Sequence, residues 1–185
     1  MVTPRLTGPA ALAAAAALAA CASMPEPATV TMAAGPVAPP LEEAAASPRV
    51  VDYAARLQCV PYARRVSGIE IYGDAYTWWE QAAGRYPRSS SPAPGAVLAI
   101  QGYRSARRGH VAVVTRVISD RVILVDHANW LNGGEISVNV PVMDVSPNND
   151  WSQIRVWHIP GGHWGGRIYH AHGFIHPLVL HAAMS

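Results

Sequence analysis

A chain of 185 residues, half of them hydrophobic, can form one ordinary domain with a real core and still have room for extensions. Its formal net charge is only +2, and its positive side chains are all arginines that form no block or stripe. This charge pattern gives no support to a nucleic-acid-binding protein, so no nucleic-acid partner is expected.

The N-terminal residues resemble a bacterial export signal. The stretch "MVTPRLTGPAALAAAAALAACASM" has one positive charge, at Arg5, followed by an Ala/Leu run that is shorter than the roughly 20 apolar residues of a membrane-spanning helix. Its end, "LAAC", is similar to a lipobox, in which the cysteine is lipid-modified. We therefore expect a lipoprotein signal peptide over residues 1–20 and lipidation of Cys21. The alternative is a plain secretory signal with an incidental cysteine.

Residues 21–48 are dominated by alanine, proline and small side chains, with no sustained periodicity. Such a composition favours extended conformers, so this segment is predicted to be a tether. Together with a lipid at Cys21, it predicts a protein anchored in the cell envelope and facing the periplasm. By analogy with other lipoproteins, the absence of aspartate after Cys21 favours the outer membrane.

Helical patterns follow the tether. "RVVDYAARLQ" has apolar residues near helical spacing, and Pro61 then interrupts, because proline suits only the first turn of a helix. A second helix is expected from Pro61 to Gly68, with Cys59 just ahead of its N-terminus. "GDAYTWWEQAAGRYP" predicts a third helix, capped by Asp74.

The second half of the chain changes to strand patterns. "AVLAI", "HVAVVTRV", "RVILVDHAN", "ISVNVP" and "IRVWHI" are rich in β-branched residues and are separated by turn-forming residues. Helices followed by antiparallel strands predict an α+β fold.

Cys59 needs an explanation, because a lipidated Cys21 would leave it without a disulfide partner in an oxidising compartment. It can be a buried small apolar side chain or a nucleophile. Its position at a helix start, where free N–H groups and the helix dipole stabilise an anion, suits a thiolate.

A base for this thiol is predicted from the strand pair around Ser119-Asp120. If these two residues form a tight turn, His110 lies directly opposite Asn129 on the same face of the sheet. His127 lies diagonally on that face, and Asp126 points to the other side. A loop one residue longer or shorter would put Ala128 or Trp130 opposite His110.

At this point the sequence resembles the CHAP family of cysteine- and histidine-dependent amidohydrolases and peptidases, which are related to the NlpC-type cell-wall enzymes. The resemblance runs from about Arg49 to Ile159. It rests on "QCVPYA", "GDAYTWW", "PAPGAVLAI", "GHVAVV", "VDHAN" and "IRVWHI", in the family's order. It implies a papain-like α+β fold, with N-terminal helices packed on a twisted antiparallel β-sheet.

The resemblance also implies roles for individual residues. Cys59 matches the nucleophile, His110 the base and Asn129 the polar third residue. Many family members carry an acidic residue just before that asparagine, where this chain has "DHAN", so the third role stays divided among Asn129, His127 and Asp126, with Asn129 favoured by the strand register.

The implied substrate is peptidoglycan, cut either at the N-acetylmuramoyl-L-alanine amide or within the peptides, without a metal or other cofactor. A regulating protein partner is not identifiable. Two other readings stay open. One is a non-catalytic envelope scaffold or wall-binding module with the CHAP fold, and the other is a cysteine peptidase that acts on a protein or small amide.

The predicted domains are a signal peptide (1–20), a tether (21–48), a CHAP catalytic domain (49–160) and a His/Gly-rich C-terminal tail (161–185). In the tail region, His170, His172 and His176 are candidate metal ligands. We expect no metal site there, because no second cysteine, nearby acidic ligand or tight ligand spacing accompanies these histidines.

Overall fold

A computed structural model of the chain describes residues 47–177. The predicted signal peptide, the lipidation site at Cys21 and nearly all of the predicted tether lie outside the described residues. No helix in the described part is long and apolar enough to cross a membrane. The elements in chain order are β1 (Arg49–Asp52), α2 (Cys59–Ser67), the 3-10 turn η1 (Ala75–Thr77), α3 (Trp78–Ala82), β2 (Arg88–Ser89), β3 (Val97–Ile100), β4 (His110–Val117), β5 (Val122–Ala128), β6 (Ile136–Asp144), β7 (Gln153–His158), the 3-10 turn η2 (Ile159–Gly161), β8 (His163–Trp164) and β9 (Tyr169–Ile175).

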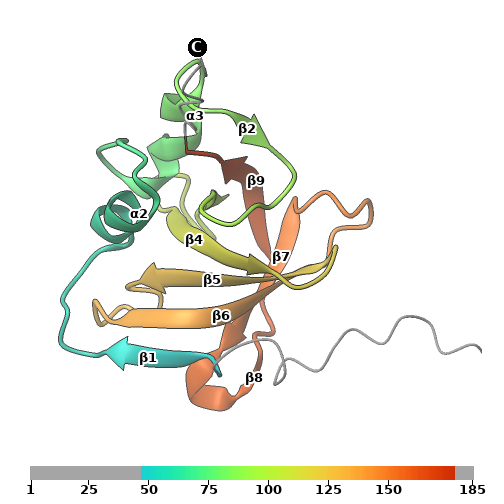
Figure 1. The fold of residues 1–185 in the computed structure, drawn as a ribbon. Coiled ribbons are helices and arrows are strands. Elements are labelled where there is room, and N and C mark those ends of the chain that lie inside the picture. Colours follow the sequence, from blue (N-terminus) through green and yellow to red (C-terminus); the bar gives the residue numbers. More distant parts are fainter. Residues whose placement is uncertain (1–46, 178–185) are drawn as a thin grey trace, which may run out of the picture. The chain divides into compact units, whose positions relative to one another are not determined.

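Six antiparallel strands form a closed barrel in the order β3-β4-β5-β6-β7-β9. The circle closes because β6 pairs with both β5 and β7, while β9 pairs with both β7 and β3. The short strands β1, β2 and β8 add to the outside of this circle by pairing with β6, β9 and β7 (Figure 1).

The prediction of an α+β fold with helices packed on a twisted sheet is wrong. The described residues are mostly β-structure, and their two α-helices have only nine and five residues. The sheet has no open edge between β3 and β7, because β9 pairs with both of these strands. The strand patterns in the sequence do not predict β9, and without β9 the sheet would stay open.

The strand β9 comes from the segment predicted to be a C-terminal tail. Its register runs from Val97 opposite Ile175 to Ile100 opposite Ala171, with a bulge near Ala99. The folded domain therefore extends past residue 160, as far as the structure describes the chain.

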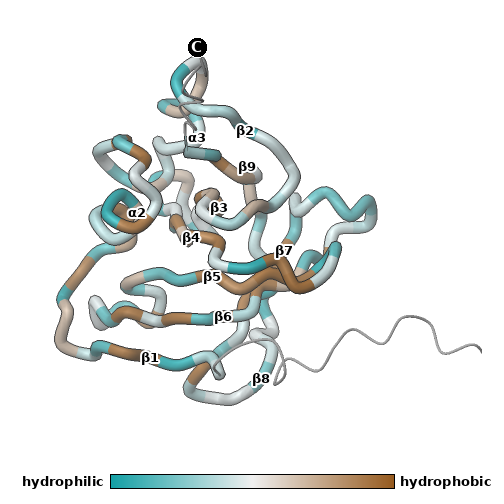
Figure 2. Tube along the Cα trace, in the orientation of Figure 1, coloured by the Kyte–Doolittle hydropathy of each residue, from teal (hydrophilic) through white to brown (hydrophobic). Residues whose placement is uncertain are grey.

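Two hydrophobic cores follow from the alternation of side chains along the strands. One core fills the barrel and includes Leu98, Ile100, Ala112 and Val114. The other lies outside β3 and β4, where residues of the opposite parity, with the helices α2 and α3, are buried: Val60, Ala63, Ile69, Ile71, Trp78, Ala82, Val97, Ala99, Val111, Val113 and Ile175. Figure 2 shows hydrophobic residues both along the barrel strands and on α2.

The helix α2 begins at Cys59 itself, with Gln58 in an extended conformation as its N-cap residue. It ends where the sequence predicts, because Gly68 adopts a left-handed φ of 73° and its N–H donates to the carbonyl of Arg64. The preceding stretch is not the predicted helix. It forms β1 and then an irregular segment, and the N–H of Leu57 donates to the carbonyl of Gly134.

The β4–β5 hairpin differs from the predicted two-residue turn. Strand β4 ends at Val117 and β5 begins at Val122, so the connection is longer than Ser119-Asp120. A register shift between Val114 and Arg116 compensates for this length. As a result Val113 still pairs with Asp126, as the predicted register requires.

Candidate active site

The first turn of α2 presents the thiol of Cys59 together with the backbone N–H groups of Cys59 and Val60. Pro61 occupies the third helical position and has no N–H, and Gln58 makes no side-chain cap. Burial raises the pKa of the Cys59 thiol, while hydrogen bonds from the backbone N–H groups of Val111, Val60 and Cys59 lower it to a lesser extent. The thiol is therefore protonated at neutral pH in the substrate-free protein.

His110 begins β4, directly before the residue whose N–H reaches the thiol. Gly109 precedes it, and a side chain there would clash with the backbone of η1, because an added Cβ would lie 2.8 Å from the nitrogen of Tyr76. Along β4, His110 shares the face of Ala112 and Val114, whose side chains fill the barrel. His110 thus stands at one end of the barrel interior.

The imidazole of His110 has a second histidine as its partner. Nε2 of His110 lies 3.1 Å from Nδ1 of His127, and the two ring planes are nearly perpendicular. Burial lowers the pKa of His110 to about 3. Burial, with a smaller contribution from the His110 charge, also places the pKa of His127 well below its usual value. Both imidazoles are consequently neutral at pH 7.

Trp130 covers this histidine pair. Its ring stacks on His127 at a centroid distance of 5.4 Å and meets His110 edge-on at 4.9 Å. Tyr169 of β9 also packs against Trp130, with ring centroids 5.1 Å apart. His127 is only 1% exposed, and its Nε2 has no hydrogen-bond partner within the described residues. The aromatic cover keeps water from the His127 ring.

Asn129 makes its contacts to the helix start and to the loop after β5. Its Nδ2 donates to Oε1 of Gln58 at 2.7 Å, and its Oδ1 accepts from the N–H of Gly134 at 2.9 Å. Asn129 has a φ of 61°, so the chain leaves the regular strand at this residue. Its side chain therefore fixes Gln58, the neighbour of Cys59, and not the imidazole of His110.

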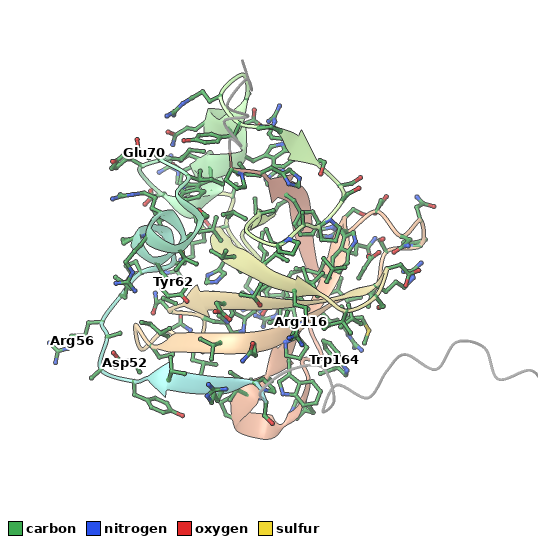
Figure 3. All side chains as sticks on the ribbon, in the orientation of Figure 1. Asp52, Arg56, Tyr62, Glu70, Arg116 and Trp164 are labelled. Carbon is green, nitrogen blue, oxygen red and sulfur yellow. The ribbon has the colours of Figure 1, made fainter. Side chains whose placement is uncertain are left out.

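Asp126 belongs to a different environment. Its Oδ1 accepts from the backbone N–H of Asn139, and its carboxylate influences Tyr62, whose pKa burial raises to about 12. Burial also raises the pKa of Asp126 itself, against the opposing effects of the Asn139 hydrogen bond and Arg49. Tyr62 lies on α2 close to the strands (Figure 3).

A cavity of about 1130 Å³ joins these parts of the site. Cys59, His110 and Asn129 all line it, as do Gln58 and Trp130, whereas His127 and Asp126 do not. Such a volume suits a substrate larger than a single amino acid. In chemical terms the cavity offers a thiol, a neutral imidazole and backbone N–H groups beside the thiol, which are the groups needed for acyl transfer through a cysteine.

Two residues of this site, Gln58 and Trp130, are not among the predicted site residues. The position of Gln58 next to the only cysteine of the expected catalytic domain is a signal that could have identified it. Trp130 entered only as an alternative register partner, although it directly follows Asn129 in the sequence. Within residues 47–177, no three histidine, cysteine or acidic side chains gather as a metal site.

The CHAP domain family matches residues 49–129, which include Cys59, His110, His127 and Asn129. The match supports the CHAP family and a peptidoglycan amidase or peptidase type of hydrolase, and it covers less than half of the chain. No curated protein matches the chain.

Proposed function

We propose that this protein is a cysteine-dependent hydrolase that cleaves amide bonds of peptidoglycan, either the N-acetylmuramoyl-L-alanine bond or a bond within the peptides. The observation that carries this proposal is the shared cavity of Cys59 and His110, with the N–H of Val111 within hydrogen-bond reach of the thiol. The CHAP match over both residues supports the same reaction class.

In the proposed reaction, the neutral pair of thiol and imidazole is the starting state. Sγ of Cys59 attacks the amide carbonyl carbon while its proton passes to Nδ1 of His110, and the C=O electrons move to the oxygen. The N–H groups of Cys59 and Val60, which lie beside the thiol in the first turn of α2, stabilise this oxyanion. The tetrahedral intermediate then collapses, and His110 gives its proton to the leaving amine as the C–N bond breaks. Water, deprotonated by His110, hydrolyses the thioester and restores the thiol.

We assign different supporting roles to His127 and Asn129. His127 accepts the Nε2–H hydrogen bond of His110, which leaves Nδ1 of His110 free to take the proton from Cys59. Asn129 holds the amide of Gln58 beside the nucleophile, where the remaining amide donors of Gln58 face the cavity. Neither role requires Asp126, whose carboxylate is engaged with Asn139.

The proposal extends to location. The lipobox-like "LAAC" and the Ala/Pro-rich tether predict an envelope enzyme with a lipid on Cys21, facing the periplasm and favouring the outer membrane. Metabolic labelling with a radioactive fatty acid tests this part separately. Label in the wild-type chain and none in Cys21→Ser is the expected result, and equal label in both would contradict it.

The reaction is tested with purified peptidoglycan and the full chain, and the released fragments are weighed by mass spectrometry. Fragments with free N-termini of L-alanine identify an amidase, and shortened peptides identify an endopeptidase. Cys59→Ser should release neither kind of fragment. The matched control is Arg116→Gln, which changes a residue near the end of β4 that is remote from α2 (Figure 3) and should keep full activity. If the wild-type chain releases no fragment, the hydrolase proposal is wrong.

One observation favours a second candidate, a non-catalytic wall-binding module. Burial raises the pKa of Cys59 and lowers that of His110, so the two groups are not a preformed ion pair. This candidate predicts that wild-type and Cys59→Ser chains sediment with peptidoglycan equally and that neither digests it. The third reading, a peptidase for proteins, predicts cleavage of a protein substrate and intact peptidoglycan.

A further inference from the structure

The cavity of the candidate active site has a strongly positive lining. Five arginines line it, and Asp74 is the single acidic residue among its lining. The arginines come from three separate parts of the fold: α2, the β3–β4 loop and the connection between β8 and β9. They are Arg64, Arg104, Arg107, Arg108 and Arg167.

These charges are not neutralised by the protein. Within residues 47–177 the one ion pair joins Arg121 to Asp144, and the side chains of the five cavity arginines donate no hydrogen bond. Like charges that converge on one concave surface repel each other and focus a positive potential into it. A ligand with several negative groups would relieve this repulsion.

Three of the five guanidinium groups lie over aromatic rings: Arg104 is 5.4 Å from the centre of the Tyr103 ring, and two others are closer to a ring. Arg64 lies 4.0 Å above the ring of Tyr72, and Arg167 lies 3.7 Å above the ring of Tyr103. A cation–π contact uses the face of the guanidinium plane and leaves its N–H edge free. That edge is the part that binds a carboxylate with two parallel hydrogen bonds.

We propose that Arg64 and Arg167 are specificity-determining residues that bind two carboxylates of the same substrate molecule. The inference rests on the proposed function and refines it: the substrate is a stem peptide of peptidoglycan with at least two free carboxylates around the scissile amide. Arg104, Arg107 and Arg108, in an exposed loop, add attraction at longer range and not a fixed contact.

The test compares two forms of one substrate. Peptidoglycan is used either with its carboxylates free or after they are converted to neutral amides with carbodiimide and ammonia. The full wild-type chain is expected to hydrolyse the free form at least 10-fold faster at limiting substrate. Arg64→Gln and Arg167→Gln should each reduce this preference by roughly 10-fold through KM, because a charged hydrogen-bonded pair contributes about one tenfold step in affinity.

The matched control is Arg116→Gln, which removes an exposed arginine of β4 that does not line the cavity. It should keep the wild-type preference. An equal rate of the wild-type chain on both substrate forms would overturn the inference but leave the hydrolase proposal standing. An unchanged preference in the two cavity variants would do the same.

A binding measurement separates this inference from the hydrolase proposal. Cys59→Ala, which cannot form the thioester, is titrated with a soluble muropeptide in its free and amidated forms, with and without Arg64→Gln. Tighter binding of the free form, lost with Arg64→Gln, supports the inference even if no chain digests peptidoglycan. Equal binding of the two forms contradicts it.

Discussion

His110 and His127 form a direct hydrogen bond, 3.1 Å from Nε2 to Nδ1, between two neutral imidazoles. One ring must donate and the other accept. The proposed reaction requires the tautomer with the hydrogen on Nε2 of His110, which leaves a lone pair on Nδ1 for the thiol. A neutral acceptor orients the ring but, unlike a carboxylate, does not stabilise the charge that His110 gains when it takes a proton.

This pairing predicts an unusual pH dependence. Because the pKa of His110 is about 3, protonation of the base should not reduce kcat/KM between pH 7 and pH 5. In His127→Glu, a carboxylate next to His110 would favour the imidazolium and raise its pKa, so the acidic limb of the profile should move toward neutral pH. A profile of His127→Glu that coincides with the wild-type profile would contradict this role.

His127→Ala should lower kcat by roughly 100-fold, near the lower end of what a positioned general base contributes. KM should change little, because His127 does not line the cavity. Steady-state kinetics on a soluble muropeptide separate the two parameters. A rise in KM at constant kcat would instead indicate a binding role.

Gln58 and Asn129 should act as one unit, since the amide of Asn129 fixes that of Gln58 at 2.7 Å. Gln58→Ala and Asn129→Ala are each expected to reduce kcat/KM by about 10-fold, the effect of one lost hydrogen bond to a developing charge. The double variant should be no slower than the slower single variant. Independent, multiplying losses would show that the two residues do not work together.

Gly134 predicts a stability effect at the base of the site. Its φ is 75°, its N–H donates to Asn129, and an added Cβ would lie 2.6 Å from the Cα of Arg56. Gly134→Ala should therefore lower the free energy of unfolding by more than the 1–2 kcal/mol or so that left-handed backbone alone costs. Urea denaturation measures this difference.

Two glycines serve as controls for that measurement. Gly84 has a φ of 69° but open space around a Cβ, so Gly84→Ala isolates the cost of the backbone conformation. Gly166 has neither a positive φ nor a neighbour within 4 Å, so Gly166→Ala should be close to neutral. Equal losses of unfolding free energy in Gly134→Ala and Gly84→Ala would show that the backbone at Arg56 moves away from the added Cβ without a cost in stability.

The two buried histidines predict lower stability in acid. Their pKa values are depressed in the folded protein and ordinary in the unfolded chain, so below about pH 6.5 the unfolded chain binds more protons. The free energy of unfolding should then fall with decreasing pH, by up to about 1.4 kcal/mol per pH unit for each histidine. Urea denaturation at pH 7 and pH 5 should show a smaller fall in His127→Gln. An equal fall in the variant would assign the effect to other groups.

The sequence predicted the local elements of the site better than their arrangement. The bounds of β4, the end of α2 at Gly68 and the outward direction of Asp126 follow from alternation, capping and turn residues, which are local properties. The predicted pairing of His110 with Asn129 requires a regular strand up to Asn129. It could not foresee the left-handed conformation of that residue, because this conformation depends on the contact of the loop with Gln58.

The closed barrel was not predicted, for a similar reason. In "YHAHGFI", His170 and His172 are exposed and Gly173 has a φ of 128°, so the stretch lacks the apolar run of a typical strand. Its buried apolar residues, Ala171, Phe174 and Ile175, are placed by pairing with strands far away in the sequence. Such long-range pairing leaves little trace in local composition.

Cys59 and His110, the proposed nucleophile and base, are anchored in different hydrophobic cores. Cys59 packs against the outer core with α2, while His110 shares the face of β4 that fills the barrel. The reactive geometry therefore exists only while α2 is seated on β4, through contacts such as that of the fully buried Ala63. A substitution that weakens the packing of α2 on β4 would abolish the proposed activity while the barrel stays folded. Enzymatic activity should therefore report the docking of α2 more sensitively than a measurement of global unfolding does.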